Sequence, residues 1–188
     1  QRMAGTSIEG VDLLALNTDV QALRRLKKVH SFAIGPETTG GVGSGGRPET
    51  GRKSIKESQD QVSELLERTD MVFIAAGMGG GTGSGAAPVV GEIARRQGAL
   101  TVGIVTMPFW FEGSQRRDTA ASELLRLQQK VDTLIVVEND RLLPSVDSRL
   151  SLEKAFQLAD DALLQGVRGV AEIVSLPGLI NVDFADVK

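Results

Sequence analysis

Two glycine-rich segments hold the residues of this sequence that are best suited to chemistry. The first glycine loop, residues 77–85, has six glycines in nine positions, together with Thr82 and Ser84. Glycine loses more backbone freedom on folding than other residues, so this density indicates a backbone that must approach a ligand closely. The N–H groups of such a turn, with the dipole of a following helix, form a binding site for phosphate. The two hydroxyls can cap that helix or donate to the phosphate.

The second glycine loop, residues 39–48, reads Thr-Gly-Gly-Val-Gly-Ser-Gly-Gly-Arg-Pro. Alone, this composition is typical of a flexible linker. Paired with the first glycine loop, it predicts a second wall of the same phosphate site.

Two other phosphate-binding patterns fit the first glycine loop less well. It is not a P-loop, because no Gly-Lys-Ser/Thr follows the glycines. Gly81, Gly83 and Ala86 match the dinucleotide pattern G-x-G-x-x-A, but that fold wants an acidic residue near the end of the next strand. Here the next strand ends in Val105-Thr106-Met107. A nicotinamide-dependent oxidoreductase and a flexible surface loop therefore remain as the weaker alternatives.

An α/β domain must position these loops, because apolar runs of strand length alternate with amphipathic helical stretches. The pattern predicts five strands, at residues 11–17, 31–34, 70–76, 100–106 and 132–137. It predicts helices at 51–69, 83–97, 114–130 and 151–164, with a short one at 167–174. With 188 residues and no linker, the chain is expected to form one domain with a parallel sheet. The glycine loops lie at strand-to-helix junctions, where α/β folds bind ligands.

Composition excludes several classes of function. The chain has no cysteine, which rules out disulfides and thiolate metal sites and fits a reducing cytosol. Its net charge is −3 and its basic pairs are scattered, which argues against a nucleic-acid partner. The most apolar stretch, residues 101–111, is too short to cross a bilayer and contains Pro108. Any membrane contact is therefore expected to be indirect.

The first glycine loop resembles the signature of the tubulin/FtsZ family, G-G-G-T-G-S/T-G, at residues 79–85. Further segments are similar to FtsZ in the same order, at 17–19, 47–52, 108–113, 139–143 and 177–187. The resemblance covers essentially the whole chain and is closer to FtsZ than to eukaryotic tubulin. It implies a Rossmann-like, three-layer α/β domain that binds GTP or GDP, with Mg²⁺ arriving on the nucleotide.

The resemblance implies phosphate contacts from both loops and from one strand end. The α- and β-phosphates would lie on Gly79, Gly80, Gly81, Thr82, Gly83, Ser84 and Gly85, with the middle three closest. The γ-phosphate would lie near Ser44, Gly45 and Gly46. Thr106 would lie beside the phosphate and the sugar.

The ribose edge is assigned to Glu112 and Arg116, which stand four residues apart and can face the same side of a helix. A surface ion pair is the alternative for these two residues.

Guanine would be held by Asn139 and Asp160, with Phe156 stacked on the ring. A carboxylate can accept from the N1–H and amino groups of guanine, and Phe156 precedes Asp160 by four residues. Asp161 could take the role if the register shifts by one. From pattern alone, Phe156 would be a core residue.

Asp183 and Asp186 are the catalytic candidates, because the last eight residues resemble the catalytic loop of the family. In the family, this loop enters the nucleotide site of the next subunit and polarises the attacking water. Their spacing also suits an N-capped helix start, so spacing alone leaves both interpretations open.

The resemblance also implies what surrounds the chain. We expect a first strand with its own phosphate loop before residue 1, and a second domain and tail after residue 188, so that residues 1–188 form an incomplete and inactive GTPase domain. The parent would be a GTPase of bacterial cell division that polymerises head to tail in the cytoplasm at the division site. Division proteins would bind through the absent tail. A structural module that keeps the fold without binding nucleotide is the alternative.

Overall fold

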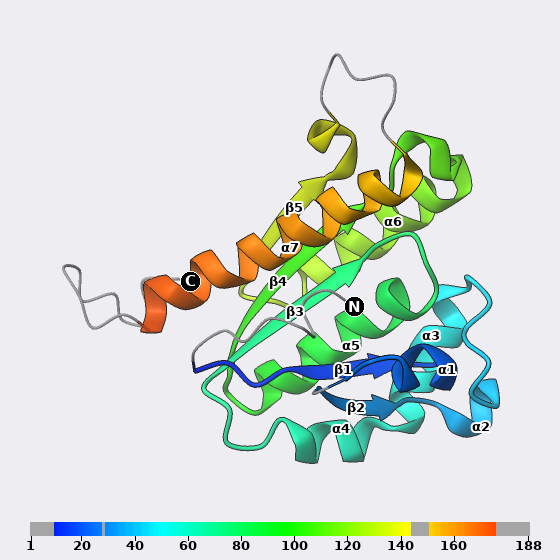
Figure 1. The fold of residues 1–188 in the computed structure, drawn as a ribbon. Helices are drawn as coiled ribbons and strands as arrows, with labels where there is room; N and C mark the ends of the chain where they lie inside the picture. Colours follow the sequence, from blue (N-terminus) through cyan, green and yellow to red (C-terminus); the bar gives the residue numbers. More distant parts are fainter. Residues whose placement is uncertain (1–9, 28, 144–150, 176–188) are drawn as a thin grey trace.

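A three-stranded parallel sheet forms the centre of the computed structural model, which describes residues 10–27, 29–143 and 151–175 (Figure 1). Its strands are β3 (Met71–Gly77), β4 (Leu100–Met107) and β5 (Thr133–Glu138), in the order β3-β4-β5. All three strands are apolar and parallel, as the sequence predicts. The predicted α/β class is therefore confirmed.

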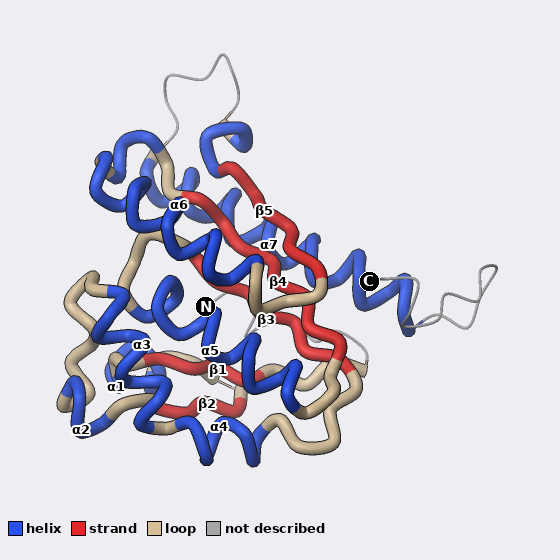
Figure 2. Tube along the Cα trace, turned by 180° about the vertical axis from the view of Figure 1, so that it is seen from behind, coloured by secondary structure: helices blue, strands red, loops and turns tan. Residues whose placement is uncertain are grey.

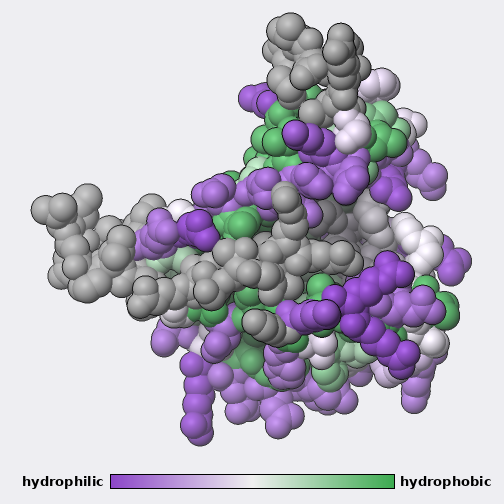
Figure 3. All heavy atoms as spheres, in the orientation of Figure 1, coloured by the Kyte–Doolittle hydropathy of each residue, from purple (hydrophilic) through white to green (hydrophobic). Residues whose placement is uncertain are grey.

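Helices cover both faces of this sheet, which makes three layers. One face packs against α5 (Thr82–Arg96) and α6 (Ser114–Gln128), and the other against α7 (Leu152–Ser175) (Figures 1 and 2). Alternation along β4 separates the two cores: Val102 and Ile104 join the cluster under α7, whereas Val105 joins the cluster under α5 and α6. Polar side chains follow the outer face of α7 (Figure 3).

A second sheet lies beside the first and has two parallel strands, β1 (Leu14–Asn17) and β2 (His30–Ala33). Its connecting helices are α1 (Val20–Arg24), α2 (Pro36–Thr39), α3 (Pro48–Glu57) and α4 (Gln59–Leu65). Within the described part of the chain, no ladder joins β1 to β3, so the single predicted sheet is divided in two.

Several helix predictions differ from the structure. The predicted helix at 51–69 is two helices that meet at Ser58, whose Oγ accepts the buried N–H of Gly35 at 3.0 Å. The predicted helices at 151–164 and 167–174 are one helix of 24 residues, α7. Gly166 lies inside it because this face packs closely: an added Cβ would lie 3.1 Å from Cγ2 of Ile104. The short α1 and α2 were not predicted.

Two short 3₁₀ helices complete the described fold, η2 (Trp110–Glu112) after β4 and η3 (Asn139–Leu142) after β5. Among the helices that the structure describes, none is both long enough and apolar enough to cross a membrane.

Candidate functional site

Both glycine loops lie at the edge of the sheets where the strands end. The strands in each sheet are parallel, so their carboxyl ends share one edge. Figure 1 shows the ends of β3, β4 and β5 beside the starts of α5, α6 and α7. This edge is where open α/β sheets bind ligands.

The first glycine loop is a closely packed turn. A Cβ on Gly81 would lie 2.3 Å from the Ser44 Oγ, and one on Gly83 would lie 2.6 Å from the carbonyl oxygen of Gly77. Gly79 has φ +93°, and its Cβ would lie 2.8 Å from the carbonyl oxygen of Arg116. Glycine is therefore required at these positions by space or by backbone conformation, and the loop is not a flexible surface segment.

The start of α5 is open to an anion. The helix begins at Thr82 after Gly81, and no side chain caps its N-terminus. Its first N–H groups and the positive end of its dipole therefore face the loop without a side-chain acceptor. Ser84 is fully buried, and its Oγ accepts the N–H of Gly79 at 2.8 Å. This hydroxyl holds the turn and does not cap the helix, contrary to one of our two expectations.

Three hydroxyls join the two glycine loops to β1. The Thr82 Oγ1 lies 2.6 Å from the Thr18 Oγ1 and 3.1 Å from the Ser44 Oγ. Thr18 and Ser44 are both buried, whereas Thr82 is half-buried. The two loops therefore contact each other, and their role as one phosphate site stays a prediction. Thr18 was not assigned a role from the sequence, although the segment 17–19, which begins at the last residue of β1, was already part of the resemblance.

Gly45 and Gly46 form the exposed end of the second glycine loop. Their φ angles are +61° and +73°, a region that favours glycine, and a Cβ on either would meet nothing within 4 Å. Backbone conformation, and not crowding, is therefore the reason for these two glycines.

The end of β4 is bound to the first glycine loop. Thr106 is buried, and its carbonyl oxygen accepts the N–H of Met78 at 2.9 Å. This bond continues the β3–β4 ladder into the loop and fixes Thr106 beside it. The predicted contact of Thr106 with the phosphate and the sugar stays a prediction.

Glu112 and Arg116 form an ion pair, with a distance of 2.7 Å between the Arg116 Nη1 and the Glu112 Oε2. The Glu112 Oε1 also accepts the N–H of Phe109 at 2.9 Å. Glu112 is mostly buried and Arg116 is exposed. The surface ion pair that was the alternative is thus present, and a ribose contact stays a prediction.

Asn139 is a buried polar residue with an unused acceptor. Its exposed fraction is 4%, and its Oδ1 is the one buried side-chain nitrogen or oxygen of the described residues that has no hydrogen-bond partner. Buried acceptors are usually satisfied, so such an atom indicates a missing donor. Its helix, η3, packs against the start of α7.

Phe156 and Asp160 lie on α7 near η3. Phe156 is 44% exposed, so the core role expected from pattern alone is wrong. Its ring stands edge-on to those of Phe109 and Phe111, with centroids 5.6 Å and 6.2 Å away. Asp160, one turn further, is half-buried, whereas Asp161 is exposed. The exposed ring of Phe156 and the carboxylate of Asp160 can therefore contact a ligand at the η3 end of the edge where the strands end.

Two further observations concern ions and the catalytic candidates. Within the described ranges, no three carboxylate, histidine or cysteine side chains gather as a metal site would require. Asp183 and Asp186 lie outside the described residues, so their catalytic role stays a prediction.

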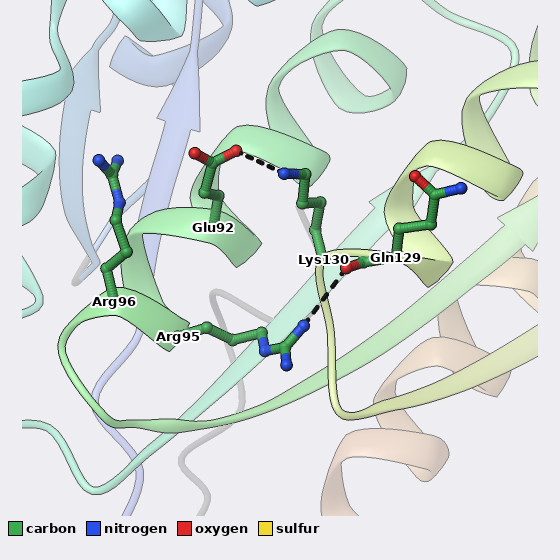
Figure 4. Close-up of a pocket in the computed structure, with 5 residues that line it drawn as sticks. All are labelled: Glu92, Arg95, Arg96, Gln129 and Lys130. Carbon is green, nitrogen blue, oxygen red and sulfur yellow. Dashed lines mark hydrogen bonds and ion pairs between the residues drawn. The ribbon is translucent and has the colours of Figure 1, made fainter.

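A shallow concavity lies at the opposite edge of the sheet, between the ends of α5 and α6 (Figure 4). It is lined by Glu92, Arg95, Arg96, Gln129 and Lys130. The Lys130 Nζ lies 2.9 Å from Glu92 and holds the pKa of that carboxyl below its usual value. Basic residues at helix C-termini are favoured by the helix dipole. The glycine loops, at the other edge, have the geometry of a ligand site.

Comparison with known proteins gives a consistent result. The family described as "Tubulin/FtsZ family, GTPase domain" matches residues 7–147. The fold is similar to an empty FtsZ dimer from M. jannaschii, with 45% identity and a TM-score of 0.92 over 99% of this chain. A point mutant of FtsZ from M. jannaschii gives the same identity and TM-score. CetZ1 from Haloferax volcanii, a GDP-bound monomer, is 25% identical with a TM-score of 0.74 over 92% of this chain. The chain spans 54% to 56% of these three structures.

Proposed function

The chain belongs to the tubulin/FtsZ family and forms its GTPase domain, and from this premise we propose that the two glycine loops bind the phosphates of GTP. The hydroxyl cluster of Thr18, Ser44 and Thr82 is the observation on which the proposal mainly rests. It brings the two glycine loops together at the open N-terminus of α5. Backbone N–H groups, a helix dipole and hydroxyl donors then face the same space, as a polyphosphate requires.

The guanine base is proposed to bind at the other end of the edge, between η3 and α7. The free Oδ1 of Asn139 would accept a hydrogen bond from the base, and Asp160 would accept from its N1–H and amino groups. Phe156 offers an exposed ring for stacking. Glu112 and Arg116 would face the ribose between the two ends.

Magnesium fits this site as an ion that is bound mainly by the nucleotide. The hydroxyls of Thr18, Ser44 and Thr82 are neutral oxygen donors, and the described residues offer no group of three carboxylates nearby. Mg²⁺ commonly keeps several waters and binds substrate phosphates with few protein ligands. When bound, it would neutralise charge on the phosphates during transfer.

Hydrolysis is proposed to take place between two copies of the protein that associate head to tail. Asp183 and Asp186 would polarise the attacking water in the site of the neighbouring copy. The similarity to an FtsZ dimer supports self-association. A head-to-tail contact would join unlike surfaces, so it could repeat into filaments. Within the cell, we propose a role in division in the cytoplasm at the division site. Other division proteins would be its partners, membranes would be contacted only through them, and nucleic acid would not be a partner.

Thr82→Arg in the complete gene product tests GTP binding. The arginine would displace the hydroxyl cluster and fill the space at the start of α5. We expect GTP binding to be lost in isothermal titration calorimetry while the far-ultraviolet circular dichroism spectrum stays unchanged, because the strands are not touched.

Gln61→Arg, at an exposed position of α4, is the matched control and should bind GTP like the wild type. Unchanged affinity in the Thr82→Arg protein would remove the first glycine loop from the site.

A further inference from the structure

The first glycine loop is held between two helices that come from different parts of the chain. On one side is α3, because a Cβ on Gly51 would lie 2.2 Å from the carbonyl oxygen of Gly81. On the other side is α6, because a Cβ on Gly79 would lie 2.8 Å from the carbonyl oxygen of Arg116. The distance between α3 and α6 therefore sets the space that the loop can occupy.

One ion pair connects these two helices directly. The Arg52 Nη2, on α3, lies 2.5 Å from the Glu123 Oε2 on α6. Arg52 follows Gly51 in the chain, and its backbone N is 2.7 Å from where a Cβ on Gly85 would lie. The pair thus joins α3 to α6 across the first turns of α5, next to the loop.

Burial makes this pair unlike the other ion pairs of the described residues. The Glu123 side chain is 4% exposed and that of Arg52 is 19% exposed, whereas the partners of the Arg141–Glu138 pair are 81% and 55% exposed. A buried pair gives little net stability, because desolvation offsets the attraction. The pair is therefore not expected to act mainly through net stability. The second neighbour of Glu123, Arg126, lies on α6 itself at 3.6 Å and cannot fix α3.

We propose that Arg52 and Glu123 are positioning residues for phosphate binding. They hold α3 and α6 at the separation at which the first glycine loop presents its N–H groups to the nucleotide. This inference rests on the proposed function, since it assigns the loop to the phosphates. Neither side chain touches the nucleotide, and their effect passes through the backbone of the loop.

A double-mutant cycle in the complete gene product tests the pair, with Glu123→Gln, Arg52→Gln and the double variant. Dissociation constants for GTP and GMP are measured by calorimetry at a temperature where circular dichroism shows a folded protein. We expect each single variant to weaken GTP binding about tenfold, which corresponds to the loss of about one hydrogen bond to the phosphates. The binding of GMP, which has fewer phosphates, should weaken less, so the difference in affinity between GTP and GMP should become smaller. The double variant should lose no more than either single one.

The Glu92→Gln variant is the matched control. Glu92 pairs with Lys130, which follows α6, so this variant also loosens a helix contact, but at the opposite edge of the sheet (Figure 4). Its GTP affinity should equal that of the wild type. If the single variants do not fold, the double variant, which leaves no buried charge unpaired, is compared with the wild type. A smaller advantage of GTP over GMP then supports the positioning role, and an unchanged advantage overturns it.

Lower melting temperatures with an unchanged ratio of GTP to GMP affinity would overturn the positioning role and leave a structural one. Additive losses in the double variant would equally exclude action as a pair. Failure of the wild type to bind GTP would instead refute the proposed function, and the inference with it.

Discussion

At the scale of single residues, Asn139 gives the clearest sign of a ligand. Burying an acceptor without a partner costs about 1–3 kcal/mol. The free Oδ1 of Asn139 is such an atom, and it lies in η3, which packs against α7, the helix that carries the half-buried Asp160 and the exposed ring of Phe156. A base that donates hydrogen bonds to the Asn139 Oδ1 and to the Asp160 carboxylate would recover this cost, which is the physical basis for expecting guanine here.

Base selection should depend on Asp160. Only guanine offers an N1–H and an amino group to the same carboxylate, so Asp160→Ala should weaken GTP by about 1–3 kcal/mol and ATP much less. Competition of GTP and ATP against a fluorescent GTP analogue in the complete gene product measures the two affinities.

Asp161→Ala is the control for Asp160→Ala, because Asp161 is the adjacent carboxylate and is exposed. It should keep the wild-type preference for GTP. If instead Asp161→Ala loses the preference and Asp160→Ala keeps it, the register of the base contact is shifted by one residue.

The two glycine loops could be located from the sequence because glycine runs at strand-to-helix junctions are local signals, whereas Thr106 and Asn139 were assigned from the family resemblance alone. Sequence reasoning could not locate Thr18 as part of the hydroxyl cluster, or the pairing of Arg52 with Glu123. Both depend on which segments meet in space, and 71 residues separate the partners of the ion pair. Phe156 was misjudged from pattern for the same reason, because the exposure of an apolar helix position depends on what covers it.

At the scale of elements, the contact between α3 and the first glycine loop can be tested by a single methyl group. In Gly51→Ala, the new Cβ would lie 2.2 Å from the carbonyl oxygen of Gly81, so backbone must move. We expect a loss of about 1–3 kcal/mol in the free energy of unfolding, with weaker GTP binding. Urea denaturation and calorimetry measure the two effects.

Gly169→Ala on α7 provides the contrast, because a Cβ there meets nothing within 4 Å. Helix propensity alone should raise its stability by up to about 1 kcal/mol. Equal behaviour of the two alanine variants would show that the close approach at Gly51 does not constrain the loop.

The short helix α2 should respond to pH through Glu57, the last residue of α3. The Thr38 hydroxyl and the backbone N–H of Glu37 hold the pKa of Glu57 below its usual value of 4.5. Both backbone N–H groups, of Glu37 and Thr38, donate to the carboxylate at 2.9 Å. Because the folded-state pKa is lowered, this stabilisation is present above pH 4.5 and is lost as pH falls through the lowered pKa.

Glu57→Gln should therefore melt at a lower temperature than the wild type near neutral pH, and the difference should shrink below pH 4.5. Glu64→Gln, which changes an exposed acid on α4, should show no such pH-dependent difference. A difference for Glu57→Gln that is constant across this range would mean that charge does not stabilise α2.

Alternation of apolar strands and amphipathic helices predicted the strands, α5, α6 and two separate parts of α7, because burial fixes those patterns locally. The break at Ser58 was not predictable, since it depends on a hydrogen bond with Gly35 from another part of the chain. Continuity of α7 through Gly166 likewise depends on its packing against Ile104.

At the scale of the whole molecule, the proposed function divides the nucleotide site between two copies of the protein. Both glycine loops and η3 lie at the carboxyl ends of the strands (Figure 1), whereas α7 runs from that edge to the opposite one, and the catalytic candidates follow it in the chain. The nucleotide site of one copy would then be completed by the catalytic candidates of a second copy, which is the central claim of the proposed function.

Mixing two inactive variants of the complete gene product tests this claim most directly. Asp183→Asn should bind GTP but hydrolyse it slowly, and Thr82→Arg has a blocked phosphate site but intact aspartates. Phosphate release is measured for each variant alone and for mixtures at several total concentrations. We expect each alone to be nearly inactive and the mixture to recover hydrolysis, with a specific activity that rises with concentration. No recovery on mixing, or wild-type specific activity that is independent of concentration, would contradict a site shared between copies.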